Sequence, residues 1–179
     1  MRNLAPPNPA FEGDLGDADP GVRQAVASAD DQEGYLRAIA ALCTTRLLMP
    51  IVASGDESMD GPDPTRHAEM AAVSIRNDAG EGALLAFTGL DALQAWQSDA
   101  RPVPCLLDDL AATVVETGDD VLLLDVAGPT PFVVGHDLIV ELARGRRLVH
   151  LPDGGFGWMF RDTGPETPRR QIGGSRVAP

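Results

Sequence analysis

Residues 119–145 read DDVLLLDVAGPTPFVVGHDLIVELARG and carry the clearest fold signal in the chain. Residues 121–126 are apolar except for Asp125, which is typical of a buried strand. The sequence GPTP predicts a turn, FVVG predicts a short second strand, and HDLIVELARG predicts a helix with one apolar face. Two strands followed directly by a helix indicate a protein that mixes α and β structure.

Further helices and strands are predicted on both sides of this segment. Asp19 followed by Pro20 predicts the start of a first helix, because aspartate caps helices and proline suits their first position. Apolar spacing predicts three more helices, at residues 31–45, 91–97 and 105–118. Apolar or alternating stretches predict strands at residues 46–53, 68–77 and 82–90, and RRLVHLP at 146–152 is a candidate edge strand.

We therefore expect one α+β domain at residues 19–152, with a mixed or antiparallel sheet of about five strands covered mainly on one side by helices. Residues 1–18 are rich in Pro, Gly and Asp and are interpreted as an extended arm, ordered only if something holds it. Residues 153–179 end in a Gly/Pro/Arg stretch and are interpreted as a flexible tail.

The sequence also predicts two details of these strands. Pro50 predicts that residues 46–53 form an edge strand or contain a bulge, because proline has no N–H to donate to a neighbouring strand. Within residues 68–77, alternation predicts that Met70, Val73 and Ile75 pack into the core.

The charge distribution excludes some classes of partner. The chain has 179 residues and a net charge of −13, and all of its 14 basic residues are arginine. Residues 64–143 carry a net charge of −10, whereas residues 144–179 carry +4. An acidic body argues against a nucleic-acid-binding fold, which concentrates cations to displace counterions from phosphates. Since no apolar run approaches the length of a signal peptide core or a bilayer span, we expect a cytoplasmic protein without membrane contact.

One stretch resembles half of a zinc deaminase signature. RHAE at residues 66–69 contains H-x-E, and Cys105 follows a proline, as in P-C-x-x-C. That signature requires a second cysteine three residues later, where this chain has Asp108, and no third cysteine exists elsewhere. Glu69 also leads into alternating strand residues rather than a helix. The sequence therefore excludes the deaminase.

Other catalytic and metal-binding patterns are missing as well. The acidic loop that begins at Asp56 has His67 where a calcium loop needs glutamate. The chain contains no G-x-S-x-G motif, and its glycine-rich stretches lack the strand–loop–helix frame of phosphate loops. His136 precedes Asp137 at a predicted helix start, where a capping or surface role is favoured over catalysis. We therefore expect no catalytic residue, no cofactor, no metal and no enzymatic activity.

The two thiols and the adjacent acids receive structural interpretations. Cys43 and Cys105 lie beside apolar runs and are expected to be buried free thiols in a reducing compartment. The acid pairs at residues 108–109 and 119–120 are adjacent in sequence, and neighbouring residues of a helix do not face each other. We interpret them as a solvated helix face and a turn before a strand.

Three ordered blocks of the chain resemble a known family. These are EMAAVSIRNDAGEGALLAFTGLDALQAW at residues 69–96, ARPVP at 100–104, and the segment at 119–145 quoted above. Together they resemble the SseB N-terminal domain family, in the form common in actinobacteria, over about residues 30–145. The resemblance implies a small α+β module. It implies no catalytic residues, because the family has none in common.

The matching blocks also contain the residues we select as a candidate site. An aromatic, a cation and an anion occur there as Trp96, Arg101 and Asp125. A buried Asp125 needs a partner, for which Arg101 is the candidate, and a structural ion pair is favoured over a binding site. The alternative is a pocket near these three residues that binds a small molecule.

The expected function is a non-enzymatic protein-interaction module with an unknown protein partner, including self-association. One alternative is a metabolite-binding domain that uses the pocket near Trp96, Arg101 and Asp125. A further alternative, which the acidic body makes unfavourable, is association with nucleic acid or the ribosome through the C-terminal arginines Arg144, Arg146, Arg147, Arg169, Arg170 and Arg176.

Overall fold

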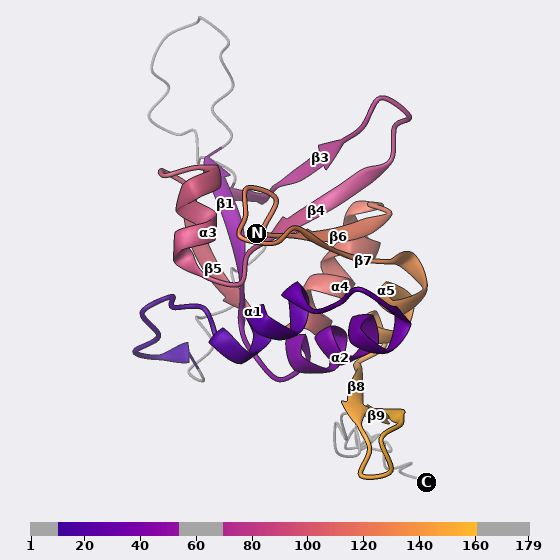
Figure 1. Ribbon diagram of the computed structural model, residues 1–179. Coiled ribbons are helices and arrows are strands. Elements are labelled where there is room, and N and C mark those ends of the chain that lie inside the picture. The colour runs from indigo at the N-terminus through magenta and orange to yellow at the C-terminus, as the bar shows by residue number, and fades with distance from the viewer. Residues whose placement is uncertain (1–10, 54–69, 161–179) are drawn as a thin grey trace, which may run out of the picture.

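The computed structural model describes residues 11–53 and 70–160. The helices are α1 (Pro20–Ala27), α2 (Gln32–Leu42), α3 (Leu90–Trp96), α4 (Leu107–Thr117) and α5 (His136–Ala143). The strands are β1 (Leu47–Ala53), β2 (Met70–Ala72), β3 (Ser74–Arg76), β4 (Gly82–Ala86), β5 (Arg101–Cys105), β6 (Val121–Leu124), β7 (Phe132–Val134), β8 (Arg146–His150) and β9 (Phe156–Phe160). The α+β class is confirmed (Figure 1).

The segment at residues 119–145 folds as the sequence predicts, into β6, a turn, β7 and α5. Strand β6 pairs antiparallel with β7 and parallel with β4, which gives the mixed sheet β3-β4-β6-β7. One part of the prediction is wrong. The strand ends at Leu124, and Asp125 follows it with a positive φ of 49° rather than lying inside it.

The described strands form three sheets rather than one sheet of five strands. Beside the mixed sheet there is a three-stranded sheet, β2-β1-β5, and a two-stranded sheet, β8-β9. The first two sheets are joined where Leu48 and Phe87 exchange both backbone hydrogen bonds, each 2.8 Å long. The strand predicted at residues 68–77 is divided, because β2 pairs with β1 whereas β3 pairs with β4. These residues therefore connect the two larger sheets.

Pro50 does not mark an edge strand, because β1 is the central strand of its sheet. Alternate residues of a strand direct their backbone groups to opposite sides. Leu48 directs its groups to Phe87 and away from β5, so Pro50 also faces away from β5. The proline nitrogen therefore lies where β1 stops pairing with Phe87 and begins to pair with β2. A missing N–H is tolerated at this position because the ladder to β5 does not use it.

Two apolar clusters occupy the two faces of the mixed sheet. The larger cluster packs α1, α2, α4 and α5 against one face, and its strand members include Leu84 and Leu122. The smaller cluster packs α3 against the other face, onto Leu85 and Phe87. Figure 1 shows α3 apart from the other four helices. The expected coverage, mainly on one side, is confirmed. Of the three residues predicted to pack from residues 68–77, Val73 joins the smaller cluster and Ile75 is exposed, whereas the Met70 side chain lies outside the described part.

The N-terminal arm is held by an arginine where it enters the described part of the chain. Arg46 forms an ion pair with Asp14 and donates hydrogen bonds to the carbonyls of Asp17 and Thr88, at 2.6 and 3.0 Å. The backbone N–H of Leu90 donates to the arm as well. Arg46 and Leu90 therefore hold residues 14–17 of the arm against the folded domain.

The C-terminal strand pair extends beyond the boundary predicted at residue 152. Residues 146–150 form β8 as predicted, but its partner is β9, which lies within the stretch interpreted as a flexible tail. Phe156 and Trp158, two residues apart on β9, pack against the larger cluster, and this contact orders the strand. None of the described helices is both long enough and apolar enough to cross a membrane.

Candidate functional site

Asp125 is a buried carboxylate that links the ends of two parallel strands. Its side chain is 2% exposed and accepts hydrogen bonds from the backbone N–H of Thr88 at 2.8 Å and from the Thr88 hydroxyl at 2.6 Å. Its own N–H donates to the carbonyl of Ala86, and its carbonyl accepts from Gly128. Asp125 therefore fixes the end of β4 to the end of β6.

Arg101 is not the partner of this carboxylate, and the ion-pair prediction is wrong. Arg101 is exposed at the start of β5, which lies beyond β1 at the outer edge of the other sheet. The cation close to Asp125 is Arg23, whose Nε donates to the Thr88 hydroxyl at 3.1 Å. The guanidinium of Arg23 also binds both carboxylate oxygens of Asp91, at 2.7 and 2.6 Å. Sequence spacing gives no signal for these partners, which come from α1, α3 and the end of β4.

Arg23, Thr88, Asp91 and Asp125 together form what we call the polar junction. The pKa values of its two aspartates follow from burial and pairing. Burial raises the pKa of Asp125, while the two hydrogen bonds from Thr88 and the charge of Arg23 oppose that rise. The hydrogen bonds from Arg23 lower the pKa of Asp91 below its usual value. Every acceptor and donor named here is already engaged within the chain. The arrangement is therefore a structural clamp rather than an open binding site.

Trp96 lies in an apolar environment. Its ring packs against Phe87 with centroids 5.6 Å apart, as part of the smaller apolar cluster. None of the cavities described below is lined by Trp96, Arg101 or Asp125. These four cavities therefore do not bring the three predicted site residues together.

The side chains considered for metal or nucleophilic chemistry have other surroundings. Among the described residues there is no group of three or more His, Cys, Asp or Glu arranged to hold a metal ion. His67 and Glu69 lie outside the described part. Cys43 and Cys105 are free thiols, and burial raises the pKa of both, that of Cys105 to about 11. A thiol with so high a pKa is protonated at neutral pH and is a poor nucleophile.

One acid of each pair is buried, whereas Asp109 and Asp120 are exposed. Asp108 is 8% exposed and accepts hydrogen bonds from Arg147 at 3.3 and 3.2 Å, so it does not belong to a solvated helix face. Asp119 is buried as well and accepts from the hydroxyls of Ser74 at 2.5 Å and Thr117 at 2.6 Å. Both carboxylates connect distant elements, which explains why they are buried.

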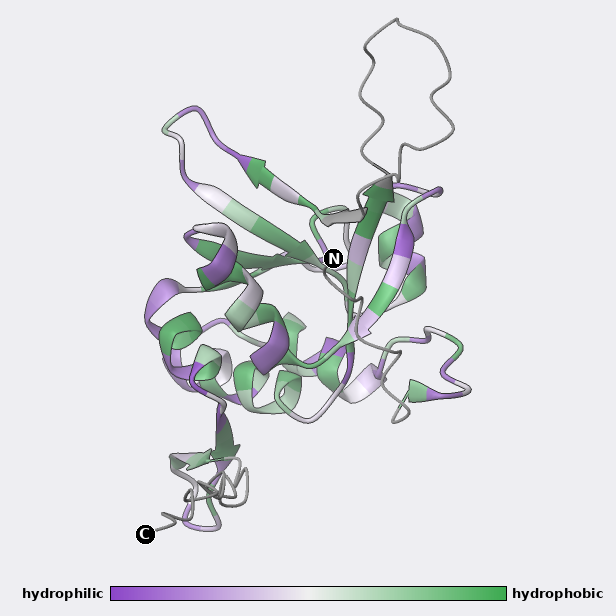
Figure 2. Ribbon diagram, turned by 180° about the vertical axis from the view of Figure 1, so that it is seen from behind, coloured by the Kyte–Doolittle hydropathy of each residue, from purple (hydrophilic) through white to green (hydrophobic). Residues whose placement is uncertain are grey.

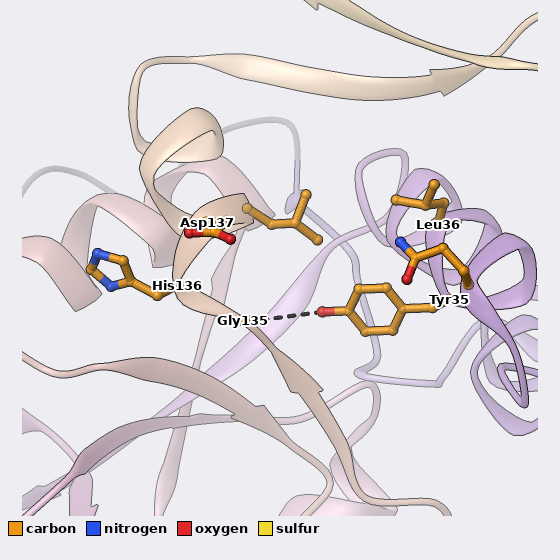
Figure 3. A pocket seen from close by; sticks show the side chains of 7 residues that line it. Tyr35, Leu36, Gly135, His136 and Asp137 are labelled. Atoms are coloured by element: carbon orange, nitrogen blue, oxygen red, sulfur yellow. Dashed lines mark hydrogen bonds between the residues drawn. The ribbon is translucent and has the colours of Figure 1, made fainter.

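A shallow cavity of about 350 Å³ lies between the starts of α2 and α5 (Figure 3). The Tyr35 hydroxyl accepts a hydrogen bond from the Gly135 N–H at 3.1 Å and donates to the Val133 carbonyl at 3.0 Å. The His136 ring points away from this hydroxyl in Figure 3. Since the hydroxyl is used to hold the backbone after β7, it is not available to position a small ligand in this cavity.

A larger groove lies between the second half of α2 and the β8–β9 hairpin. It consists of two cavities of about 470 and 570 Å³ that share Thr44, Leu148 and Val149. We call it the hairpin groove. Its remaining lining residues are Arg37, Ala40, Ala41, Cys43, Arg147, His150, Met159 and Phe160. The lining is apolar apart from Thr44, two arginines and a histidine, and none of the described lining residues is acidic.

The exposed end of β9 forms one wall of this groove. Met159 is 58% exposed and Phe160 is 67% exposed, and the guanidinium of Arg146 lies 4.9 Å from the centre of the Phe160 ring. The hairpin projects from the helical side of the molecule, with hydrophobic residues on both strands (Figure 2). The sequence does carry a signal for it, because FGWMF is an apolar run with aromatic residues at every second position. The Gly/Pro/Arg stretch that follows FGWMF has the composition of a flexible tail and obscures this signal.

The arginines considered for nucleic-acid binding are partly neutralised. Arg144 and Arg146 both form ion pairs with Glu141, and Arg147 pairs with Asp108. The other candidates, Arg169, Arg170 and Arg176, lie outside the described part. Paired cations contribute less to phosphate binding than free ones, since their own acid must first be displaced.

Comparison with known proteins agrees with the resemblance seen in the sequence. The model of the SseB protein N-terminal domain matches residues 22–141, from α1 into α5. No curated protein and no solved structure matches the chain. The polar junction therefore lies inside the matched region, whereas β8 and β9 lie after it. The chain belongs to the SseB N-terminal domain family.

Proposed function

We propose that this protein is a non-enzymatic interaction module that binds a segment of another protein in the hairpin groove. The observation that carries the proposal is the pair Met159 and Phe160, two large apolar side chains that are more than half exposed beside an apolar groove. Contiguous exposed apolar surface on a folded protein marks a site of interaction. A protein partner gains by covering these side chains, because burial of apolar area is the main favourable term in association.

The chemistry of the groove selects a partner segment that combines apolar and acidic side chains. Arg37, Arg147 and His150 are the ionisable nitrogen-containing side chains among the lining residues, and none of those residues is acidic. Arg37 and Arg147 each already pair with an acid outside the lining, so they favour an acidic segment less strongly than free cations would. Opposite charge across an interface guides association and disfavours wrong partners. Residues 161–179 of the chain itself carry four arginines against two acids, so their charge does not match the groove. We therefore favour an external acidic segment over the chain's own C-terminus.

The absence of enzymatic activity is part of this proposal and has its own support. The buried acids of the described part are bound to threonine, serine or arginine, and both thiols have raised pKa values. The metabolite alternative is less favoured, because Asp125 is already bound to Thr88. We place the protein in the cytoplasm, in keeping with its two free cysteines.

Selection from a displayed library of random short peptides on the full chain tests the proposal. We expect enrichment of peptides that contain both aromatic or aliphatic and acidic residues. Their binding should change the fluorescence of Trp158, which lies on β9 beside Met159. Phe160→Ser should weaken binding at least about tenfold, as expected for loss of an aromatic anchor.

A matched control separates this effect from a general loss of surface hydrophobicity. Val115 is 56% exposed on α4, away from the groove, so Val115→Ser should leave peptide binding unchanged. Enrichment of basic peptides, or equal losses in the two variants, would contradict the proposal. The Trp96→Phe background removes the only other tryptophan and keeps the fluorescence change assigned to Trp158.

A further inference from the structure

The edges of the two larger sheets are protected to different degrees, and β5 is blocked by proline. Leu48 faces Phe87, so Pro104, which lies opposite Leu48 on β5, directs its backbone outward. Pro102, two residues earlier and opposite Pro50, faces outward as well. Neither position has an N–H to offer, so an incoming strand finds acceptors but no donors there. Proline on an edge strand is a known protection against strand addition.

The opposite edge, at β7, is occupied by a side chain from α2. The Tyr35 hydroxyl binds the carbonyl of Val133 and the N–H of Gly135, two backbone groups that would otherwise face outward. The Tyr35 ring stacks on Phe132 with centroids 5.2 Å apart and fixes the hydroxyl in place. An added strand at β7 would have to displace this packed tyrosine.

Strand β3 differs from β5 and β7, because its outer edge has no such protection. Val73 accepts a hydrogen bond from Leu85 at 2.9 Å, and Asn77 donates one to Glu81 at 3.1 Å. By alternation, Ser74 and Arg76 direct their N–H and C=O groups away from β4. No described residue forms a backbone hydrogen bond with those outward groups. Both of these residues are exposed, and the β3–β4 hairpin extends beyond the helices (Figure 1).

We propose that β3 pairs antiparallel with β3 of a second copy of the chain, around a two-fold axis at Ile75. In this register Ser74 of each copy lies opposite Arg76 of the other, so the outward N–H and C=O groups satisfy one another. The two mixed sheets, each with the order β3-β4-β6-β7, become one continuous sheet. This contact is separate from the hairpin groove and leaves that groove free for a partner.

The side chains on β3 favour a second copy as the occupant of this edge. Ile75 is 40% exposed and lines a cavity with Ala83 and Val121, so the two copies of Ile75 meet across the axis and cover this apolar surface. Directly opposite side chains of an antiparallel pair are the closest neighbours in a sheet. At the axis, Ile75 of one copy therefore packs against Ile75 of the other.

The other face of β3 has matching charges. Ser74 donates to the carboxylate of Asp119 at 2.5 Å, and Arg76 lies 3.8 Å from the same carboxylate. Across the axis, Arg76 of one copy then lies opposite Ser74 and the attached Asp119 of the other. The proposed register places opposite charges together and keeps the two Arg76 side chains apart.

A proline substitution tests the edge without removing a hydrogen bond to β4. The N–H of Ser74 faces outward, so Ser74→Pro removes a donor that only the second copy uses, and Ser74→Ala is its control because both variants lose the bond to Asp119. Sedimentation equilibrium of the full chain should show a concentration-dependent dimer. Ser74→Pro should weaken it about tenfold or more and Ser74→Ala much less, with unchanged circular dichroism. A wild-type chain that stays monomeric, or a dimer unaffected by Ser74→Pro, overturns the proposal.

Charge substitution at the axis gives a second test that does not depend on proline being tolerated. Ile75→Lys and Ile75→Glu each place like charges opposite each other, so each variant alone should be monomeric. Mixed in equal amounts, the two variants should form a heterodimer, detected by native mass spectrometry at the sum of the two masses. A mixture that remains monomeric overturns the register. Neither outcome depends on peptide binding in the hairpin groove.

Discussion

The polar junction around Asp125 and the hairpin groove differ in how completely their side chains are satisfied. In the junction, the Asp125 carboxylate is bound by Thr88, and Arg23 is bound by Asp91. In the groove, Met159 and Phe160 remain exposed. Asp125, which the sequence offers as a candidate binding residue, instead helps to hold the fold together. The surface proposed to bind a partner is mainly apolar and includes the end of the last described strand.

The largest effect is expected from opening the junction with Asp125→Ala. This change leaves the buried N–H of Thr88 without an acceptor, which costs about 1–3 kcal/mol, and places alanine at a positive φ, which adds about 1 kcal/mol. Asp125→Asn keeps an acceptor and tolerates the left-handed backbone, so it should cost less than about 1 kcal/mol. Urea denaturation gives both free energies of unfolding. Equal losses in the two variants would mean that the hydrogen bonds to Thr88 are not what holds the strand ends together.

Removal of Arg46, which binds the N-terminal arm, should have the next largest effect on stability. Arg46→Ala breaks the ion pair with Asp14 and two hydrogen bonds to backbone carbonyls, and we expect a loss of about 2 kcal/mol. Arg37→Ala breaks only the exposed pair with Glu33 and should cost less than about 0.5 kcal/mol. Thermal and urea unfolding of both variants measure the contrast. A similar small loss in both would show that the arm contributes nothing to stability.

Asp14 and Asp125 should give the stability opposite pH dependences, because pairing dominates at Asp14 and burial dominates at Asp125. Hydrogen bonding to Arg46 lowers the pKa of Asp14, so its contribution is present above the usual value near 3.9 and is lost as pH falls through the lowered pKa. Burial raises the pKa of Asp125, so its effect has the opposite sign: stability falls as pH rises through that pKa.

We therefore expect Asp14→Asn to be less stable than wild type at about pH 6 and to approach it below about pH 3. The stability of Asp125→Asn relative to wild type should instead be highest at about pH 6. At that pH the ionised, buried carboxylate lowers the stability of the wild-type protein most. Denaturation midpoints across this range measure both differences. A gap between Asp14→Asn and wild type that stays constant with pH would exclude the ion pair with Arg46 as its cause.

The smallest effect on stability is expected at the groove, where the effect on binding is largest. Phe160→Ser removes a side chain that is mostly exposed, so the free energy of unfolding should change by less than about 0.5 kcal/mol. Thermal unfolding checks this value alongside the peptide-binding measurement. A clear loss of stability would mean that Phe160 packs into the fold and is not available to a partner.

The parts that could be predicted from the sequence are those governed by local patterns. Asp19 caps α1, and Gly118 ends α4 with a φ of 72°, because capping depends on neighbouring residues. The β6–β7–α5 segment is also local. The partner of Asp125 could not be predicted, since Thr88 is 37 residues away and no periodicity connects them. The division of residues 68–77 between two sheets likewise depends on which distant strands are available.

The candidate site could be predicted only in part, for a related reason. Trp96, Arg101 and Asp125 stand in blocks typical of the family, but sequence order does not show that β5 lies beyond β1. FGWMF shows the alternation of a strand, yet a strand needs a partner, and β8 becomes its partner only through a turn rich in glycine.

Quantitative affinity capture from the native cell, with full-length wild-type, Phe160→Ser and Val115→Ser baits side by side, tests most directly whether the hairpin groove binds a protein partner. We expect at least one protein that is retained by wild type and by Val115→Ser, is lost with Phe160→Ser, and binds the purified chain through an acidic segment. Identical captures by all three baits, or partners that depend on Val115 instead, would contradict the assignment of function to the groove.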